Sequence, residues 1–173
     1  RATTRATAGA RAGAPAAVGP AGRDRGSGRC RGRLRRAAVV DDLVHGTRTV
    51  AVRGQGAETD GSPLRPSGCV QLDRAIVGLN GLPAHHLGWA QCRALGAAAL
   101  DLTAVAAGRL DAFVDCSPEG LAPWDYLGAA LICREAGATL VPLHDDRPLH
   151  DLTAPVRRPV VAAATVGLAA DLS

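Results

Sequence analysis

The sequence has no lysine, no methionine and only four aromatic side chains among its 173 residues. With 47% hydrophobic residues it can still build the core of one domain, but that core must be mostly aliphatic. No apolar run reaches the roughly 18 residues of a membrane span, and the start lacks the apolar stretch of a secretory signal. These absences predict a soluble, cytoplasmic protein with no membrane partner.

Several patterns that carry chemistry are also missing. The five cysteines are widely spaced and form no C-x-x-C pair, so neither a disulfide framework nor a zinc site is indicated. A G-x-x-x-x-G-K-[ST] phosphate loop cannot exist without lysine, and no G-x-S-x-G nucleophile motif is present. The stretch "GQGAET", residues 54–59, begins like a dinucleotide-binding loop, but the third glycine of that pattern would fall on Thr59.

Charge is unevenly distributed along the chain. Residues 1–36 carry ten of the twenty arginines and a single acid, Asp24, which gives them a net charge of +9, whereas residues 37–173 carry −5. The basic segment is rich in arginine, alanine and glycine and has almost no large aliphatic side chains, so we expect it to be disordered. It could serve as an arm that binds nucleic acid. Without interleaved aromatics, however, a solvated tail is favoured and a nucleic-acid partner is not expected.

From residue 37 the chain alternates between short Val/Thr-rich runs and Ala/Leu-rich helical patterns. Apolar residues between Leu95 and Ala106 recur at helical spacing, and Gly108 is placed to end that helix. The patterns predict two strands joined by a hairpin within 37–64, with a further turn at Asp60-Gly61, and a strand within 69–80. They then predict a helix over 93–108, a strand over 109–115, a helix over 124–136, strands at 138–143 and 158–165, and a final helical turn or two over 166–173. Such alternation predicts an α/β layered domain over residues 37–173, with the polar stretch 144–151 as a solvated loop.

Asp125 stands at the start of the predicted helix 124–136, directly after Pro123 and Trp124. An acid at this position commonly accepts hydrogen bonds from free backbone N–H groups and faces the positive end of the helix dipole. On helix rules alone, Asp125 is therefore a helix cap. Its sequence neighbours suggest a second role.

Several stretches of the chain follow one known set of motifs. Trp124-Asp125 followed by "YLGAALICREAGA" matches the signature W-D-x-A-A, a short apolar stretch and E-A-G-G. Residues 93–115, "RALGAAALDLTAVAAGRLDAFVD", match a Gly-Ser-Ala-Ala helix ending V-A-x-G and a strand of the type L-D-A-Y-x-E. Residues 39–64, "VVDDLVHGTRTVAVRGQGAETDGSPL", follow the hairpin of the same set. Together these motifs resemble the inositol monophosphatase family, in the correct order over residues 37–173.

The resemblance implies an α-β-α-β-α layered sandwich, incomplete at its N-terminal side, and Mg²⁺-dependent hydrolysis of a small phosphate monoester such as inositol phosphate or histidinol phosphate. It also allows a homodimer. In the family the aspartate after the tryptophan is a metal ligand, which gives this role to Asp125. Asp115 occupies the position of a glutamate that binds substrate hydroxyls. The stretch that lines the substrate pocket corresponds to Gly96, Ala97 and Ala98, where Ala97 lacks the hydroxyl of the family's residue.

One carboxylate cannot hold the Mg²⁺ ions of such a site. The family's other ligands lie upstream, in a Glu-Glu pair and in a loop of the form D-P-[IL]-D-G-T. The stretch Asp42–Thr47 imitates that loop, but its place in the hairpin 39–57 puts it downstream of the true metal loop. We therefore expect residues 37–173 to be the C-terminal portion of a family member, with weak or absent activity on their own. The second hypothesis is a non-catalytic, partner-binding module that retains the family fold.

Overall fold

The computed structural model describes residues 37–144, 148–150 and 157–173. The expected disorder of residues 1–36 and half of the expected loop 144–151 fall outside the described residues. The described part forms two sheets and three α-helices. No helix within it is long and apolar enough to cross a membrane.

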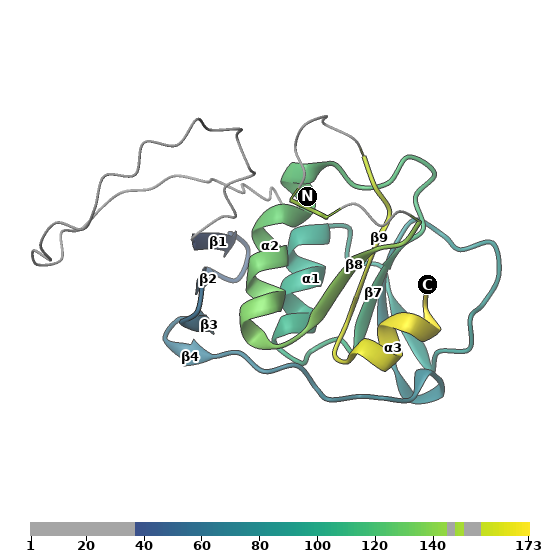
Figure 1. Ribbon diagram of the computed structural model, residues 1–173, viewed down its shortest axis with the longest axis horizontal. Coiled ribbons are helices and arrows are strands. Elements are labelled where there is room, and N and C mark those ends of the chain that lie inside the picture. The colour runs from purple at the N-terminus through teal and green to yellow at the C-terminus, as the bar shows by residue number, and fades with distance from the viewer. Residues whose placement is uncertain (1–36, 145–147, 151–156) are drawn as a thin grey trace, which may run out of the picture.

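The first part of the domain is a four-stranded antiparallel sheet in the order β1-β2-β3-β4 (Figure 1). Its strands are β1 (Ala37–Asp42), β2 (Thr47–Val52), β3 (Gly56–Thr59) and β4 (Ser62–Pro63). The sequence predicted only two strands here. The turn predicted at Asp60-Gly61 is confirmed, because both residues adopt positive φ, 49° and 81°, and β4 returns alongside β3.

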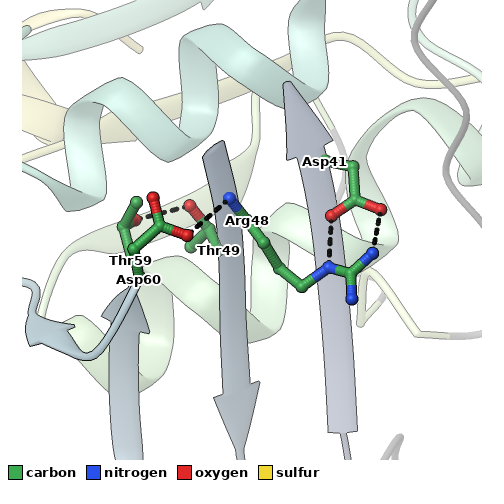
Figure 2. A network of polar contacts seen from close by, with 5 residues as sticks. All are labelled: Asp41, Arg48, Thr49, Thr59 and Asp60. Atoms are coloured by element: carbon green, nitrogen blue, oxygen red, sulfur yellow. Dashed lines mark hydrogen bonds and ion pairs between the residues drawn. The ribbon is translucent and has the colours of Figure 1, made fainter. Parts of the chain in front are cut away.

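Polar side chains tie neighbouring strands of this sheet together (Figure 2). Arg48 on β2 donates two hydrogen bonds to Asp41 on β1, from Nε at 2.7 Å and from Nη2 at 2.9 Å. The hydroxyl groups of Thr49 and Thr59 share a hydrogen bond of 2.6 Å, and Asp60 accepts one from the Arg48 backbone N–H at 3.1 Å. Because Asp41 faces Arg48 and Thr49 faces Thr59 across the strands, these contacts support the register.

The second sheet has five strands in the order β6-β5-β7-β9-β8. Its strands are β5 (Ile76–Asn80), β6 (Gln91–Arg93), β7 (Ala112–Asp115), β8 (Thr139–Pro142) and β9 (Val160–Ala163). Strand β5 pairs in parallel with both β6 and β7, whereas β9 is antiparallel to β7 and β8. Strands β7 and β9 are buried along their whole length, which fits their nearly continuous apolar composition.

The α-helices are α1 (Ala98–Ala106), α2 (Pro123–Ala136) and α3 (Val166–Asp171). The prediction for α2 is confirmed to within one residue, and Gly137 ends this helix in the left-handed conformation, with a φ of 96°. The prediction of a helix over 93–108 was wrong at its start. Arg93 pairs in β6 and Gly96 has a φ of 80°, which a helix does not allow, so α1 begins only at Ala98.

Helices α1 and α2 lie side by side between the two sheets (Figure 1). Their apolar faces form one core with the inner face of the four-stranded sheet, where Val40, Leu102 and Ile132 are fully or almost fully buried. Helix α3 covers the opposite face of the five-stranded sheet, and its Leu168 packs in a second core with Val77. The layers therefore run sheet, helices, sheet, helix.

The α/β class predicted from the sequence is confirmed, and four layers of the predicted α-β-α-β-α order are present. No helix in the described ranges covers the outer face of the four-stranded sheet. Val39 and Val50 pair across β1 and β2 on that face and are partly exposed, and Val52 is exposed beside them. This outer face carries the three valines beside the paired Asp41 and Arg48, and no described layer covers it.

Candidate functional site

The predicted site residues gather at one end of the domain. Because β5, β6 and β7 are parallel, their carboxyl ends meet at one edge of the sheet. Asn80 ends β5 and Asp115 ends β7, and the two residues are paired in register. Helix α1 begins shortly after β6, and α2 begins shortly after β7, so both helices also start at this end (Figure 1).

Asp115 is 1% exposed, and its two carboxylate oxygens have different surroundings. Its Oδ1 accepts hydrogen bonds from the Ser117 backbone N–H at 3.0 Å, the Ser117 hydroxyl at 2.6 Å and the Asn80 side-chain amide at 2.9 Å. Its Oδ2 is buried and has no hydrogen-bond partner within the described ranges. Burying a carboxylate oxygen without a donor is costly, so Oδ2 is a ready acceptor for a donor from outside the described residues.

The loop after β5 packs directly on the loop after β7. Gly81 has a φ of 79°, and a Cβ atom at this position would lie 3.0 Å from the carbonyl carbon of Cys116 and from the backbone nitrogen of Ser117. Only glycine allows so close an approach in this conformation. The contact helps to hold Ser117 where it can bind Asp115.

Asp125 lies in the first turn of α2 and is partly exposed. Its Oδ2 accepts a hydrogen bond from the Ala122 backbone N–H at 3.0 Å. Ala122 occupies the N-cap position, where its methyl group cannot accept a hydrogen bond, so Asp125 makes the capping contact from within the helix. The predicted capping role of Asp125 is confirmed. Its role as a metal ligand stays a prediction.

The predicted substrate-lining stretch, Gly96 to Ala98, forms the entry into α1. Gly96 is exposed, and a Cβ atom at this position would meet no other atom within 4 Å. Ala97 is the N-cap residue of α1 and provides no side-chain capping bond. The stretch therefore presents only methyl groups and backbone atoms, and its contact with a substrate stays a prediction.

A buried acid that was not predicted, Asp101, lies in the first turn of α1 behind this stretch. Burial raises its pKa to about 6, and a hydrogen bond from the Ala97 backbone opposes this shift in part. Its Oδ1 has no hydrogen-bond partner in the part of the chain that the structure describes. The only sequence signal for this group was an acid standing between Leu100 and Leu102 in an otherwise apolar helix.

The loop between β7 and α2 is anchored to the segment that leads into β9. Leu121 and Arg158 exchange two backbone hydrogen bonds of 2.9 Å each. Gly120 has a φ of 72°, and a Cβ atom at this position would clash with the backbone of Arg158 and Pro159. This tight junction fixes the start of α2, and with it Asp125, relative to the five-stranded sheet.

The described residues do not form a Mg²⁺ site by themselves. No group of three or more His, Cys, Asp or Glu side chains within them could hold a metal ion. Mg²⁺ takes several oxygen ligands in a nearly octahedral arrangement, which Asp125 alone cannot supply. A carboxylate is a suitable ligand for Mg²⁺, but a single one is too few to complete the site.

The stretch that imitates the family's metal loop is a hairpin turn, as its sequence context predicted. Asp42 accepts hydrogen bonds from the backbone N–H groups of Val44 and His45 at 3.0 and 3.1 Å. Its other oxygen lies 2.7 Å from Nδ1 of His45. The hydrogen bonds from His45, that of the ring first, hold the pKa of Asp42 below its usual range. Asp42 thus stabilises the β1–β2 turn.

Comparison with known proteins matches nearly the same residues that carry the sequence motifs, 37–173. The pattern of the inositol monophosphatase family matches residues 34–173. The Nus factor SuhB of Escherichia coli strain K12 is 39% identical over 122 residues, which are 62% of this chain and 44% of SuhB. The inositol-1-monophosphatase of Bacillus subtilis strain 168 is 28% identical over 123 residues, which are 60% of this chain and 43% of that enzyme. The chain thus spans less than half the length of these curated relatives.

The fold has a close match among solved structures. A hypothetical protein from Pyrococcus horikoshii, described as similar to inositol-1 monophosphatase, superposes with a TM-score of 0.68 at 23% sequence identity. The match covers 79% of this chain and 55% of that protein. At this level of identity the likeness shows the fold alone, and it confirms the fold predicted from the sequence motifs.

Proposed function

The chain belongs to the inositol monophosphatase family, and from this premise we propose that its described residues form part of a site that hydrolyses a small phosphate monoester. One observation carries the proposal: Asp115, the stretch 96–98 and Asp125 come from three different elements whose ends meet at one edge of the five-stranded sheet. Inositol phosphate and histidinol phosphate are candidate substrates.

In this proposal the described residues lie on both sides of the ester bond. Asp115 and the stretch 96–98 contact the alcohol, and the free Oδ2 of Asp115 accepts a hydrogen bond from an alcohol hydroxyl. Asp125 supplies one carboxylate to a metal ion, for which the family resemblance implies Mg²⁺. Carboxylate oxygen is the ligand that Mg²⁺ prefers in proteins.

Hydrolysis also needs ligands that the described residues lack. We propose that the further carboxylates come from polypeptide outside the described residues. On this view the described residues bind metal weakly by themselves and carry out no hydrolytic step alone.

The second candidate function is a module that binds a partner protein through the four-stranded sheet. The outer face of that sheet carries the partly exposed Val39 and Val50. A hollow of about 400 Å³ is lined by Val50, Val52 and Leu64 together with the charged side chains Glu58, Arg65 and Glu135. Exposed aliphatic side chains grouped on a sheet are typical of a surface that another layer covers. Light scattering and Mg²⁺ calorimetry separate the two functions, since a module assembles without binding metal.

A cytoplasmic location and assembly as a homodimer remain part of the proposal. Light scattering of the purified chain tests whether it forms a homodimer. The expected lack of a nucleic-acid partner rests on residues 1–36, which the structure does not describe, and stays a prediction.

A chimera tests the proposed function. Residues 37–173 would replace the matching part of the Bacillus subtilis inositol-1-monophosphatase, whose remaining sequence would supply the other metal ligands. We expect Mg²⁺-dependent release of phosphate from inositol 1-phosphate, and loss of most of this activity on Asp125→Asn. Asp171→Asn is the matched control, because Asp171 is an exposed acid at the end of α3, on the far face of the five-stranded sheet.

Two results would contradict the proposal. One is a chimera that folds, as judged by circular dichroism, but releases no phosphate. The other is an Asp125→Asn chimera as active as its parent, which would show that Asp125 is not a metal ligand.

A further inference from the structure

Asn80 is the only asparagine in the sequence, and it is the last residue of β5. Strands β5 and β7 are parallel, and Asn80 is paired in register with Asp115. Asp115 is 1% exposed, whereas Asn80 is partly exposed. Of these two neighbours at the candidate site, Asn80 is therefore the one that a molecule at the surface reaches more easily.

Three contacts hold Asn80 in place. Its side-chain Nδ2 donates to Oδ1 of Asp115 at 2.9 Å, and its backbone carbonyl accepts the Cys116 N–H at 2.7 Å. The following residue, Gly81, packs against the backbone of Cys116 and Ser117. The backbone contacts already join the two strand ends, so the side-chain bond adds something else: it fixes the orientation of the Asn80 amide.

The chemistry of this bond determines which amide atoms are left over. Oδ1 of Asp115 also accepts the Ser117 backbone N–H, so it is an acceptor and is met by the amide nitrogen rather than by the amide oxygen. The amide oxygen is thus turned away from the carboxylate. Within the described ranges, this oxygen and the second amide N–H of Asn80 have no hydrogen-bond partner.

An amide with a free oxygen and a free N–H can accept a hydrogen bond from a hydroxyl group and can also donate one to it. Because the amide is already oriented, a ligand that binds it immobilises little additional side chain. Oδ2 of Asp115, on the same carboxylate, is buried and also lacks a donor within the described residues. Asn80 and Asp115 together therefore leave several polar atoms unpaired at this edge of the sheet.

We propose that Asn80 is a further substrate-binding residue, whose side-chain amide contacts a hydroxyl group on the alcohol part of the ester. Asp115 acts on Asn80 as a positioning residue, in addition to its own proposed contact with the alcohol. The inference rests on the proposed function and adds a residue to the site.

NMR of the full 173-residue chain tests the inference, because the chain has only four side-chain amides, those of Asn80, Gln55, Gln71 and Gln91. The ¹⁵N-labelled protein is titrated with myo-inositol 1-phosphate in the presence of Mg²⁺. A second titration uses inorganic phosphate, which lacks the alcohol. We expect the ester to shift the side-chain N–H signals of Asn80 saturably and inorganic phosphate to leave them unchanged.

Gln71 is the internal control in the same spectra. It is exposed and precedes β5, so it lies at the end of that strand opposite to Asn80, and its signals should not move. Asn80 signals that the ester does not shift would overturn the inference. Equal shifts from the ester and from inorganic phosphate would also overturn it, because the change would then come from the phosphate group.

Kinetics of the chimera with the Bacillus subtilis enzyme separate a substrate contact from a structural role. Asn80→Ala should raise KM for inositol 1-phosphate about five- to tenfold, as expected for one lost hydrogen bond. It should leave kcat and the inhibition constant of inorganic phosphate unchanged, and Gln71→Ala should change none of these constants. An unchanged KM, or equal changes in KM and in the inhibition constant, would show that Asn80 only joins the strands.

The outcomes can be told apart from those of the proposed function. Shifted Asn80 signals together with an inactive chimera would keep Asn80 as a ligand contact and reject the proposed hydrolysis. An active chimera whose KM does not respond to Asn80→Ala would keep the hydrolysis and reject the role of Asn80. The NMR titration uses the parent chain, so it decides the inference even where the Asn80→Ala chimera does not fold.

Discussion

Asp125 has a capping role and a proposed metal-binding role, and each depends on a different property of its carboxylate. It caps α2 by accepting the Ala122 N–H at 3.0 Å, and in the proposed function it binds a metal ion. Capping needs an acceptor oxygen, whereas a Mg²⁺ ligand needs a negatively charged one. Substitutions can therefore separate the two roles at this residue.

Asp125→Ala removes the capping contact and should lower the free energy of unfolding by about 1 kcal/mol. Asp125→Asn keeps an acceptor oxygen and loses only the interaction of the charge with the helix dipole, which is worth about 0.5 kcal/mol. Urea denaturation in metal-free buffer measures both values. If the two variants were equally destabilised, the charge and not the hydrogen bond would account for the cap.

Asp101 should make the stability of the protein depend on pH. Burial raises its pKa in the folded state from the usual 3.8 to about 6, so the folded state holds this proton more tightly than the unfolded state does. Its contribution to stability is complete below pH 3.8 and is lost as the pH rises through about 6. The raised pKa corresponds to roughly 3 kcal/mol between the two protonation states.

Asp101→Asn removes this titration. We expect the variant to lose less stability than the parent chain between pH 4 and pH 8, by a few kcal/mol on the order of the pKa difference. Thermal or urea unfolding at both pH values provides the measurement, and Asp171→Asn serves as the control for an exposed acid. Parallel pH profiles of the parent and the Asp101→Asn chain would show that Asp101 is not buried as described.

The sequence could identify some of these residues and not others, for a physical reason. Asp115 and Asp125 belong to local motifs, so their positions at a strand end and a helix start were predictable. The state of the Asp115 carboxylate was not, because one of its donors, Asn80, lies 35 residues away in the chain. Likewise the burial of Asp101 depends on the elements packed around α1, which the local pattern does not contain.

At the scale of elements, the junction between the β7–α2 loop and the segment before β9 positions the start of α2. Leu121 and Arg158 form a single bridge there, and Gly120 fits against it only without a side chain. Any side chain at Gly120 must move the bridge or the loop. The position of Asp125 should therefore depend on this glycine.

Gly120→Ala should destabilise the protein by about 1–3 kcal/mol through the positive φ alone, and by more through the clash with the Arg158 backbone. Gly167→Ala is the control, because Gly167 lies in α3 and a Cβ atom there meets nothing within 4 Å. That change should stabilise the protein by about 0.5–1 kcal/mol. Urea denaturation of the two variants gives the comparison, and a Gly120→Ala chain as stable as the parent would contradict the described junction.

Elements with strong local signals were the predictable ones. Helix α2 begins with Pro123 and is ended by Gly137, and both signals were visible in the sequence. Strands β4 and β6 have only two and three residues and exist because a neighbouring strand pairs with them. Such pairing is a tertiary property, which explains why β4 was missed, along with the four-residue β3, and why the predicted helix 93–108 included part of β6.

At the scale of the whole molecule, the helical layer between the two sheets should behave as a close-packed core. Cys133 on α2 is fully buried there, and its thiol donates to the Leu102 carbonyl of α1 at 3.3 Å. Burial raises the pKa of the Cys133 thiol to about 12, whereas Cys92 is exposed.

Thiol labelling in mildly alkaline buffer tests this packing. Cys92 should react quickly with a disulfide reagent, and Cys133 should react only when the domain unfolds. Mass spectrometry of the labelled peptides assigns each site, and Cys92→Ser provides the control in which the label on that one peptide is missing. Rapid labelling of Cys133 under native conditions would mean that α1 and α2 do not pack between the sheets as described.

The number of metal ligands in the described residues limits the hydrolysis that they can carry out alone. The described residues give the family fold and one candidate metal ligand, and they contain no cluster of three possible ligands. Calorimetric titration of the full chain and of Asp125→Asn with Mg²⁺ tests this account most directly. It predicts weak, saturable binding with a dissociation constant on the order of millimolar that is absent from the Asp125→Asn chain. Identical heats for the two proteins, or micromolar binding accompanied by phosphate release from the chain alone, would contradict it.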